Sequence, residues 1–489
     1  MEVEFDYDLM VIGGGSGGLA AAKQAASNGA KVALCDFVKP SSAGTKWGLG
    51  GTCVNVGCIP KKLMHFASLS GEALHDAAEA GWGVDVKAAH NWEKMINNVN
   101  NHIRSLNWGY KVALMEKEVI YYNKLASFVD SHKVKLVDAQ GGEEFVTAKH
   151  FIIAVGGRPN SLPLPGFQEH SITSDDLFWK KTAPGKTLVI GAGYIAMECG
   201  GFIQSMGHQV TMLVRSTPLK EFDQDMIKRV TLTMENMGTK FVTGYDSSKG
   251  SIVKDEATGK LTVTYLANGV DVVEEFDTVL VAIGRSSDTK ALGLDAAGVS
   301  YTKWNKITTD AANKTNVEHI WAIGDAVEGN PELTPVAIRE GLLLADRLYA
   351  KSERLFNYDM ISTTIFTPLE YSKCGMSEEE AEKRYGADNI EMYHTAFKPL
   401  EWNFLKTRQN SICYCKAVCL MKEDMRVVGL HYVGPNAGEV MQGYAVGMLK
   451  GMTIKDLQDT VGIHPTCSEE ITDLKITKRQ QKEVVKTGC

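Results

Sequence analysis

The sequence has no long apolar run, few cysteines for its length and no excess of basic residues. Its 489 residues contain no stretch of about 18 consecutive apolar residues, so no membrane-spanning helix is predicted. The formal net charge of −7 argues against a nucleic-acid-binding protein, which is usually basic. Ten cysteines are too few for a disulfide-stapled scaffold, so we expect most of them to be buried and a few to be reactive.

The composition is that of a globular protein, with 44% hydrophobic and 23% charged residues. The length predicts two to four domains. The first residues are acidic and lead almost at once into an apolar strand, which leaves no room for a signal or transit peptide. We therefore expect a cytoplasmic protein.

Two segments of the sequence repeat the same order of elements. In the first, a strand at Tyr7–Ile12 precedes a glycine-rich turn, a helix at 19–28 and a strand at 31–34. In the second, a strand at Thr187–Ile190 precedes a glycine turn, a helix that ends near residue 206 and a strand at 209–214. This order predicts two doubly wound α/β domains with parallel sheets.

The other segments fit this frame. The apolar spacing predicts a helix at 92–113, and short apolar strands at 150–155, 278–283 and 319–323 are each followed by glycine. From about Phe366 the pattern changes to alternating strands at 411–421 and 426–433, followed by helices at 437–450 and 454–459. These segments predict a third, α+β domain.

The first glycine turn matches a dinucleotide-binding fingerprint at Gly13, Gly15 and Gly18. The first glycine permits the tight turn, the second lets the backbone approach a pyrophosphate, and the third allows close packing of helix and strand. Asp36 follows the next strand, where a carboxylate can accept hydrogen bonds from a ribose 2′-hydroxyl. A purely structural turn is the alternative, but strand, helix and acid are all at the expected positions.

The second glycine turn, which contains Gly191 and Gly193, leads to a different ribose position. Arg215 stands where the first segment has an acid, and Lys220 follows five residues later. Cations at this position favour the 2′-phosphate of NADP, although both could instead be solvated surface charges. An acidic and a basic ribose site in one chain suggest FAD at the first turn and NADPH at the second.

Two cysteines lie close together between the first fingerprint and the first long helix. Cys53 and Cys58 occur in the string GGTCVNVGCIPKK, at the predicted start of a helix. Cysteines at this spacing can form a disulfide, and a helix N-terminus stabilises a thiolate. A metal site would need a second paired cluster, which the sequence lacks. Two buried structural cysteines are the remaining alternative.

The string GGTCVNVGCIPKK resembles the redox-active disulfide of the glutathione reductase and thioredoxin reductase family. The segment Ala322-Ile323-Gly324-Asp325 resembles that family's second FAD motif, and Leu333-Thr334-Pro335 resembles the start of the following helix. His464-Pro465-Thr466-Cys467-Ser468-Glu469-Glu470 resembles its HPxxxE segment. The resemblance covers essentially the whole chain.

The resemblance implies a role for each of these residues. Cys58 would be the charge-transfer thiolate beside the flavin and Cys53 the interchange thiol. His464, held by Glu469, would be the acid/base and would come from the partner subunit of a homodimer. Lys61 and Glu198 would pair beside the flavin, Tyr194 would gate the nicotinamide, and Arg285 would assist Arg215 and Lys220 with NADPH. The remaining implied cofactor-binding residues are Ser16, Gly17, Phe37, Gly51, Thr52, Ala126, Asp325, Leu333, Thr334, Ala196 and Gly284.

The same resemblance divides the chain into five segments. Residues 1–158 and 288–358 would form an FAD-binding domain, and residues 159–287 an NADPH-binding domain inserted between its two parts. Residues 359–474 would form a dimerisation domain, and residues 475–489 a mobile redox tail. We expect no resident metal.

The C-terminal extension indicates the subfamily. It resembles the tail of high-molecular-weight thioredoxin reductases, in which a Gly-Cys-selenocysteine-Gly or Cys-Cys end carries electrons to thioredoxin. Here Gly488 and Cys489 occupy the matching register, so we expect the native protein to continue with selenocysteine and glycine. A chain with Cys489 alone would oxidise NADPH but reduce thioredoxin poorly. A disordered basic tail with an incidental cysteine is the alternative.

We therefore predict an NADPH-dependent thioredoxin-disulfide reductase with FAD. Glutathione reductase is the nearest alternative, but Lys23 and Leu342 stand where that enzyme has arginines for glutathione. Dihydrolipoamide dehydrogenase is disfavoured by Arg215, and a redox-sensing flavoprotein would need neither His464 nor Glu469. Val155 departs from the threonine usual in the family. We expect Cys413, Cys415 and Cys419, which share one strand face, to be core residues.

Overall fold

The computed structural model describes residues 4–87, 89–403, 405–408 and 410–484. These residues form two compact units, each assembled from three separate stretches of the chain. Unit 1 comprises Met1–Lys61, Trp92–Ala183 and Ile283–Phe356, and unit 2 comprises Lys62–Asn91, Pro184–Ala282 and Asn357–Cys489. Within the described ranges, none of the helices combines the length and apolar character needed to cross a bilayer.

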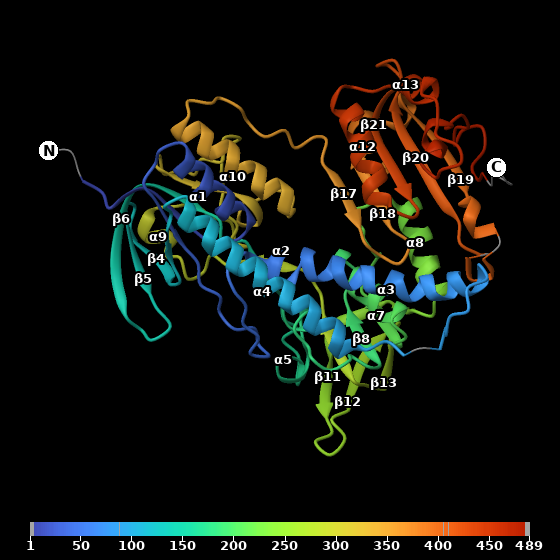
Figure 1. Cartoon of the computed structure of the whole chain (residues 1–489), viewed down its shortest axis with the longest axis horizontal. Helices are drawn as coiled ribbons and strands as arrows, with labels where there is room; N and C mark the ends of the chain where they lie inside the picture. The colour runs from blue at the N-terminus through green and yellow to red at the C-terminus, as the bar shows by residue number, and fades with distance from the viewer. Residues whose placement is uncertain (1–3, 88, 404, 409, 485–489) are drawn as a thin grey trace. The chain divides into compact units, whose positions relative to one another are not determined.

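Unit 1 is built on a parallel sheet that continues into an antiparallel meander (Figure 1). The parallel part has the order β3-β2-β1-β6, with β16 on the other side of β6, and the first half of β6 pairs with β5 and then β4. Alternate residues of β1 enter two different cores, because helices pack on one face of this sheet and the antiparallel meander packs on the other. The strands are β1 (Tyr7–Ile12), β2 (Val32–Cys35), β3 (Ile120–Tyr122), β4 (Leu125–Asp130), β5 (Lys133–Val137), β6 (Glu143–Ile153) and β16 (Ile320–Ala322).

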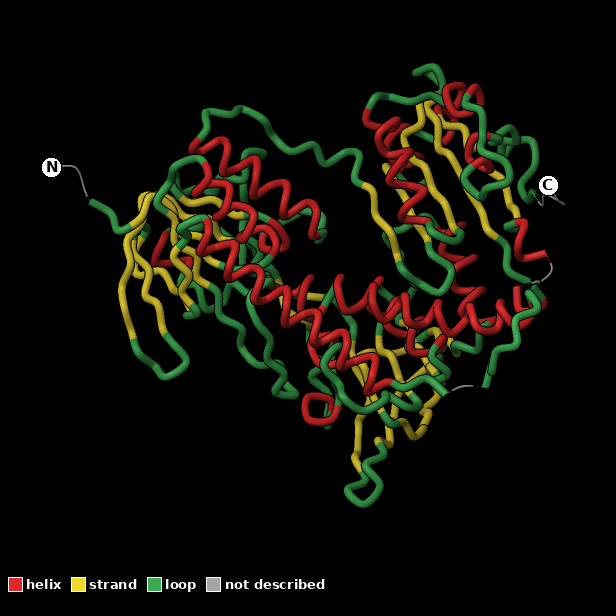
Figure 2. Tube along the Cα trace, in the orientation of Figure 1, coloured by secondary structure: helices red, strands yellow, loops and turns green. Residues whose placement is uncertain are grey.

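Two long helices of unit 1 lie side by side on the sheet, as Figures 1 and 2 show. They are α1 (Ser16–Ser27) and α10 (Thr334–Tyr349), and they approach so closely that a Cβ at Gly341 would lie 2.6 Å from the carbonyl oxygen of Gly17. The other elements of the unit are α2 (Gly51–Val56), α4 (Trp92–Glu116), β7 (Gly157–Pro159), α5 (Phe167–His170), α6 (Ser174–Leu177), β15 (Arg285–Ser287), α9 (Leu294–Ala297) and the 3-10 turn η1 (Gly324–Ala326).

The nucleotide-fold part of unit 2 repeats this architecture on a smaller scale. Its sheet is parallel, in the order β10-β9-β8-β14, and every residue of β8 and β14 is buried. The elements are β8 (Thr187–Ile190), α7 (Tyr194–Ser205), β9 (Val210–Val214), α8 (Gln224–Asn236), β10 (Lys240–Thr243) and β14 (Thr278–Val281). An antiparallel meander is inserted before the last strand: β11 (Tyr245–Lys254), β12 (Leu261–Ala267) and β13 (Val270–Phe276). The long helix α3 (Cys58–Glu79) begins in unit 1 and continues into unit 2.

The C-terminal part of unit 2 is an antiparallel sheet of order β17-β18-β21-β20-β19, with α12 lying across one face (Figure 2). Cys413, Cys415 and Cys419 are fully buried on β20, which confirms that they are core residues. The elements are β17 (Ser362–Ile365), β18 (Tyr371–Gly375), α11 (Glu378–Tyr385), η2 (Ala387–Asn389), β19 (Ile390–Phe397), η3 (Leu400–Asn403), η4 (Lys406–Arg408), β20 (Cys413–Leu420), β21 (Arg426–Val433), α12 (Ala437–Leu449), α13 (Ile454–Asp459) and α14 (Glu469–Thr472).

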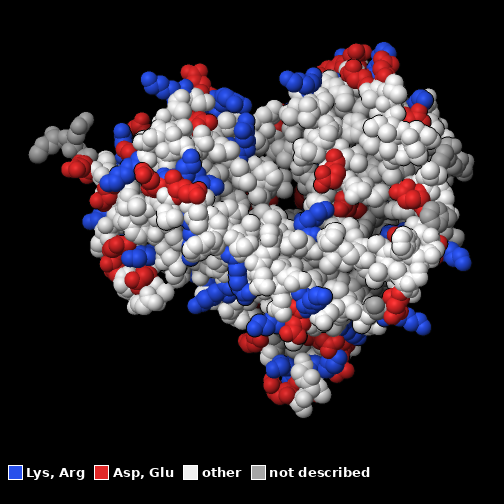
Figure 3. Space-filling view, viewed as in Figure 1, with Lys and Arg blue, Asp and Glu red and all other residues white. Residues whose placement is uncertain are grey.

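The predicted fold class is therefore confirmed: two doubly wound domains and an α+β domain. Lysine, arginine, aspartate and glutamate side chains occur together over the face in Figure 3. The strands Tyr7–Ile12 and Thr187–Ile190 end where predicted, whereas the helix predicted at 92–113 continues to Glu116. The antiparallel meanders β4–β5 and β11–β13 were not predicted.

Candidate active site

A cleft in unit 1 lies over the carboxyl ends of its parallel strands. It encloses about 830 Å³ of space free of protein atoms, part of it open to solvent. Ten predicted cofactor-binding residues line it, together with Cys53: Gly13, Gly15, Ser16, Gly17, Asp36, Phe37, Gly51, Thr52, Asp325 and Thr334. The sequence-predicted residues thus converge on one cavity.

The glycines of the first turn are required for different reasons. Gly13 has φ +112°, and a Cβ there would lie 2.3 Å from the carbonyl oxygen of Ala154. A Cβ on Gly18 would lie 1.9 Å from the carbonyl oxygen of Gly13, so the helix can pack on the strand only without it. At Gly15 the nearest protein atom to a Cβ would be 3.8 Å away, in ordinary contact. The protein itself does not demand a glycine at that position, and the close approach of a ligand would explain it.

Two acids of the cleft suit the hydroxyl groups of a dinucleotide. The Asp36 carboxylate accepts a hydrogen bond of 2.8 Å from the Gly14 N–H, and burial raises its pKa. Burial also raises the pKa of Asp325. No donor among the described residues reaches the Asp325 carboxylate, so this acceptor is available to a ligand hydroxyl. The residues therefore fit a dinucleotide.

The two cysteines lie on either side of a break between two helices. Cys53 lies in the first turn of α2, Gly57 ends that helix, and Cys58 is the first residue of α3. A Cβ on Gly57 would lie 2.9 Å from the carbonyl oxygen of Thr52, so a larger residue would force this junction apart. The N-terminus of α3 favours negative charge at its first residue. A single helix running through both cysteines would not have offered this site.

The two thiols share one neighbour. The Cys58 Sγ lies 3.5 Å from the Thr334 hydroxyl, at the start of α10. The hydrogen bond with Cys58 and burial raise the pKa of Cys53, while Thr334 opposes the shift. Both sulfur atoms are thus in hydrogen-bonding reach of one another beside the cleft. Cys53 is half-buried and Cys58 is exposed.

Arg285 of β15 bonds within its own unit. Its guanidinium donates to the Thr52 hydroxyl at 3.0 Å and to the carbonyl oxygen of Gly157. Its predicted role toward NADPH stays a prediction. Leu333 is the N-cap of α10, Gly284 has φ +106° before β15, and Ala126 is buried in β4 among core residues.

The second glycine turn lies in unit 2. Gly191 has φ +122°, and a Cβ on Gly193 would meet no atom within 4 Å. Tyr194 begins α7 and is 39% exposed, whereas Ala196, on the same helix, is fully buried. Arg215 is exposed directly after β9, and among the described residues nothing forms a hydrogen bond or ion pair with it. Its guanidinium is available to an anionic ligand.

Two further charged residues near these turns have different surroundings. Lys220 is exposed, and its ammonium lies 3.4 Å from the carboxylate of Glu221. Glu198 of α7 is buried, and its carboxylate accepts a hydrogen bond of 2.8 Å from the Phe366 N–H. Lys61 lies in the first turn of α3. The predicted pairing of Lys61 with Glu198 stays a prediction.

His464 and Glu469 of unit 2 lie together as predicted. The His464 Nδ1 is 3.1 Å from one carboxylate oxygen of Glu469, which is the first residue of α14. The imidazole is 66% exposed while the carboxylate is 24% exposed, so one ring edge is held and the other faces solvent. Cys489 lies outside the described residues.

Comparison with known proteins shows the family to which this chain belongs. The sequence profile described as pyridine nucleotide-disulphide oxidoreductase matches residues 7–341, which is more than half of the chain. The chain belongs to this family. The profile of the family's dimerisation domain matches residues 361–475. The chain is also 52% identical over 495 aligned residues to thioredoxin reductase SEP1 of Emiliania huxleyi, and the alignment covers 99% of each protein.

Membership of the pyridine nucleotide-disulphide oxidoreductases confirms the family predicted from the cysteine string and implies the use of a flavin and a pyridine nucleotide. Some residues of the cleft were not predicted. Trp47, Arg158 and Asp288 line it, and the Arg158 guanidinium lies 4.7 Å from the Trp47 ring centre. The sequence Gly156-Gly157-Arg158 after the end of β6 was a signal that could have found one of them.

Proposed function

We propose that this chain is an NADPH-dependent flavoenzyme that reduces the disulfide of thioredoxin. Electrons pass from NADPH through FAD to the Cys53–Cys58 disulfide, and then to a C-terminal redox group of the partner subunit that includes Cys489. The net reaction consumes NADPH, one proton and one thioredoxin disulfide, and it yields NADP⁺ and two thiols. Full-length similarity to a protein named thioredoxin reductase supports the substrate.

The observation that carries the proposal is the shared position of the cleft and the cysteine pair. Cys53 and Thr334 line the cleft, and the Cys58 sulfur lies beside Thr334. When bound there, FAD supplies the transfer of an electron pair from the nicotinamide to a disulfide. The hydrogen bond between the two thiols supports a pair that alternates between a disulfide and a dithiol.

The specific cofactors follow from charge. Asp36 suits a ribose that carries free hydroxyls, as in FAD, whereas the unengaged cation Arg215 suits the 2′-phosphate of NADPH. Lys220 is also exposed, and a single exposed ion pair does little to prevent it from turning toward a phosphate. A carboxylate in place of Arg215 would have favoured NADH.

Different residues around the thiols carry out thiol–disulfide exchange and proton transfer. Cys53 is proposed to attack or leave in exchange with the partner's redox group, because thiolates rather than thiols carry such steps. The hydrogen bond from Nδ1–H of His464 to Glu469 leaves Nε2 as the ring atom that takes or gives the proton. Replacing His464 by glutamine should lower turnover by about 10²–10⁴-fold.

A homodimer is proposed from the surface next to His464. Val461 and Ile463 are 92% and 77% exposed, and Val446 and Leu449 of α12 are 61% and 57% exposed. Large apolar side chains left exposed to solvent are typical of an association surface, and the match to a dimerisation domain supports the same conclusion. Sedimentation should show a dimer for the native protein and a monomer for Val461→Asp combined with Ile463→Asp.

An assay of the native protein with NADPH tests the function. We expect fast turnover with thioredoxin and slow turnover with glutathione disulfide. Cys58→Ser should abolish both, whereas Cys489→Ser should abolish thioredoxin reduction and still allow NADPH to reduce the Cys53–Cys58 disulfide, counted by alkylation and mass spectrometry. Fast turnover with glutathione disulfide alone would indicate a glutathione reductase. The absence of turnover with either substrate would indicate a redox sensor.

A further inference from the structure

The last described segment of the chain is added to the edge of the C-terminal sheet. The His394 N–H donates to the carbonyl oxygen of Ile476 at 3.0 Å, and the Lys478 N–H donates to the carbonyl oxygen of Met392 at 2.9 Å. Tyr393 and Thr477 form an antiparallel bridge between these bonds. The segment therefore extends the sheet beyond β19 for a few residues.

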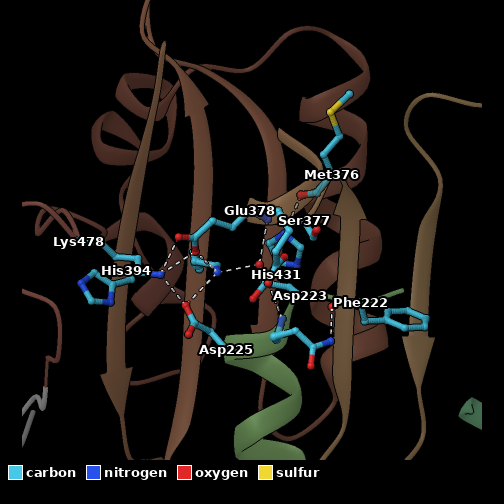
Figure 4. Close-up of polar contacts among 12 residues, drawn as sticks. Phe222, Asp223, Asp225, Met376, Ser377, Glu378, His394, His431 and Lys478 are labelled. Carbon is cyan, nitrogen blue, oxygen red and sulfur yellow. Dashed lines mark hydrogen bonds and ion pairs between the residues drawn. The ribbon is translucent and has the colours of Figure 1, made fainter. Parts of the chain in front are cut away.

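The side chain of Lys478 enters a cluster of carboxylates (Figure 4). Its ammonium lies 2.8 Å from Asp225 and 2.7 Å from Glu378. Lys416, which is completely buried, pairs with the same two acids at 3.1 and 2.6 Å and with Asp223 at 2.7 Å. We call these five residues the ion cluster. The first turns of α8 and α11 and the strand β20 meet in it.

The ion cluster needs Lys478 for its charge. Asp223 caps α8 and Glu378 is the first residue of α11, positions where helix dipoles favour acids. Three carboxylates face Lys416 alone if Lys478 is removed. The pKa of Lys478 is raised in spite of its burial, because Asp225 and Glu378 accept hydrogen bonds from its ammonium. Loss of one partner from such a cluster leaves charges that are only partly compensated.

Two more contacts hold the same segment. The His394 ring lies 2.8 Å from the carbonyl oxygen of Gln481 through Nε2 and 2.6 Å from the Tyr414 hydroxyl through Nδ1. The Arg479 guanidinium donates to the carbonyl oxygens of Ala387 and Ile390 at 2.9 and 3.0 Å. A basic extension that only needed to stay in solvent would require none of these contacts.

We propose that Lys478 is a positioning residue for the C-terminal redox group. Lys478 holds residues 476–481 against β19 and the ion cluster. This attachment fixes the position of the chain eight residues before Cys489. This inference rests on the proposed function. Cys489 lies eight residues beyond Gln481 but fifteen beyond Leu474, which is fully buried and whose carbonyl oxygen accepts a hydrogen bond from Gln458. The effective concentration of a tethered group falls roughly as the −3/2 power of tether length, so loss of the anchor would lower it about threefold.

Three variants of the holoenzyme test the anchor. Lys478→Met removes the charge and keeps the length of the side chain, and Lys478→Arg keeps the charge. Lys475→Met is the matched control, because Lys475 is three residues away, 70% exposed and paired only with Asp473 among the described residues. For each variant we would measure amide hydrogen exchange at residues 476–481, kcat with thioredoxin, and the rate at which NADPH reduces the Cys53–Cys58 disulfide.

For Lys478→Met we expect exchange at residues 476–481 to accelerate about tenfold or more, since hydrogen bonds to charged groups contribute about 1.5–3 kcal/mol. The kcat with thioredoxin should fall about threefold or more, with the rate of the first disulfide unchanged. Lys478→Arg should restore both, and Lys475→Met should change neither. Unchanged exchange, or an equal fall in both rates with a lower melting temperature, would overturn the inference. If the wild type itself does not reduce thioredoxin, the proposed function fails, and exchange alone decides the anchor.

Discussion

The two glycine turns of this chain have the same backbone plan but differ in what their third position tolerates. In the first turn a Cβ on Gly18 would lie 1.9 Å from a carbonyl oxygen, whereas in the second turn Ala196 carries a Cβ and is fully buried. At the middle position the turns agree, because Cβ atoms on Gly15 and Gly193 would be free of close contacts. Only the middle glycines therefore lack a reason inside the protein.

This difference distinguishes glycines that the packing of the fold requires from glycines that a bound ligand would require. The first and third glycines of the first turn are fixed by the fold and would be needed even without a ligand. The middle glycines point to a ligand that approaches the backbone, and so do the side chains that follow. Asp36 already accepts a hydrogen bond from the turn, while Arg215 bonds to nothing among the described residues. The evidence for a ligand therefore comes from the middle glycines and from the charged residue that follows each second strand.

The largest effect is expected when the third position of the first turn is made like that of the second. Gly18→Ala places a Cβ against a backbone oxygen, so α1 must move away from β1. Overpacking of this kind typically costs about 1–3 kcal/mol and more where, as here, the obstacle is a backbone atom, and the displaced helix should also release flavin. Ala196→Gly, the reverse change, should cost about 1 kcal/mol or less. Thermal melting and the flavin absorbance of the purified proteins would check both, and a stable, flavin-loaded Gly18→Ala would contradict the comparison.

The next effect concerns the cation of the second turn. Arg215→Ala removes one charge-assisted contact of about 1.5–3 kcal/mol, so the KM for NADPH should rise roughly 10- to 100-fold. The KM for NADH should change little, because NADH lacks the 2′-phosphate. Lys228→Ala is the matched control, since Lys228 is also exposed and lies on α8, the next helix along the chain after β9. An equal rise in the KM values for NADPH and NADH would mean that Arg215 does not bind the 2′-phosphate.

The sequence predicted best where a strand is buried on both faces. Tyr7–Ile12 and Thr187–Ile190 are mostly apolar and end directly before glycine, so their ends are visible without any structure. The meander β11–β13 was missed although β12 alternates buried and half-buried residues throughout. In the neighbouring β13 the apolar residues Val270 and Val273 are 64% and 65% exposed, which blurs the pattern.

The candidate site was predictable where the chemistry is local. The cysteine pair, the glycine turns and the pairing of His464 with Glu469 depend on residues close in sequence. The ion cluster was not predictable, because its acids and lysines come from segments between residues 223 and 478 and meet only in the folded chain. The break at Gly57 was also missed, since nothing in the local sequence distinguishes an interrupted helix from a continuous one.

The smallest effect is expected at the acid of the first turn. Asp36→Asn keeps an acceptor for the Gly14 N–H but replaces a charged acceptor for a ribose hydroxyl by a neutral one. A hydrogen bond contributes about 0.5–1.5 kcal/mol, so the dissociation constant for FAD should rise only about two- to tenfold. Because burial raises the pKa of Asp36, the carboxylate is lost as the pH falls through that raised value, and it is restored above it. Flavin titrations should therefore show the two proteins converging at low pH and separating as the pH rises. A difference that grew toward low pH would show that the charge of Asp36 is not what binds the ribose, and the contrast with Arg215 would then rest on one turn alone.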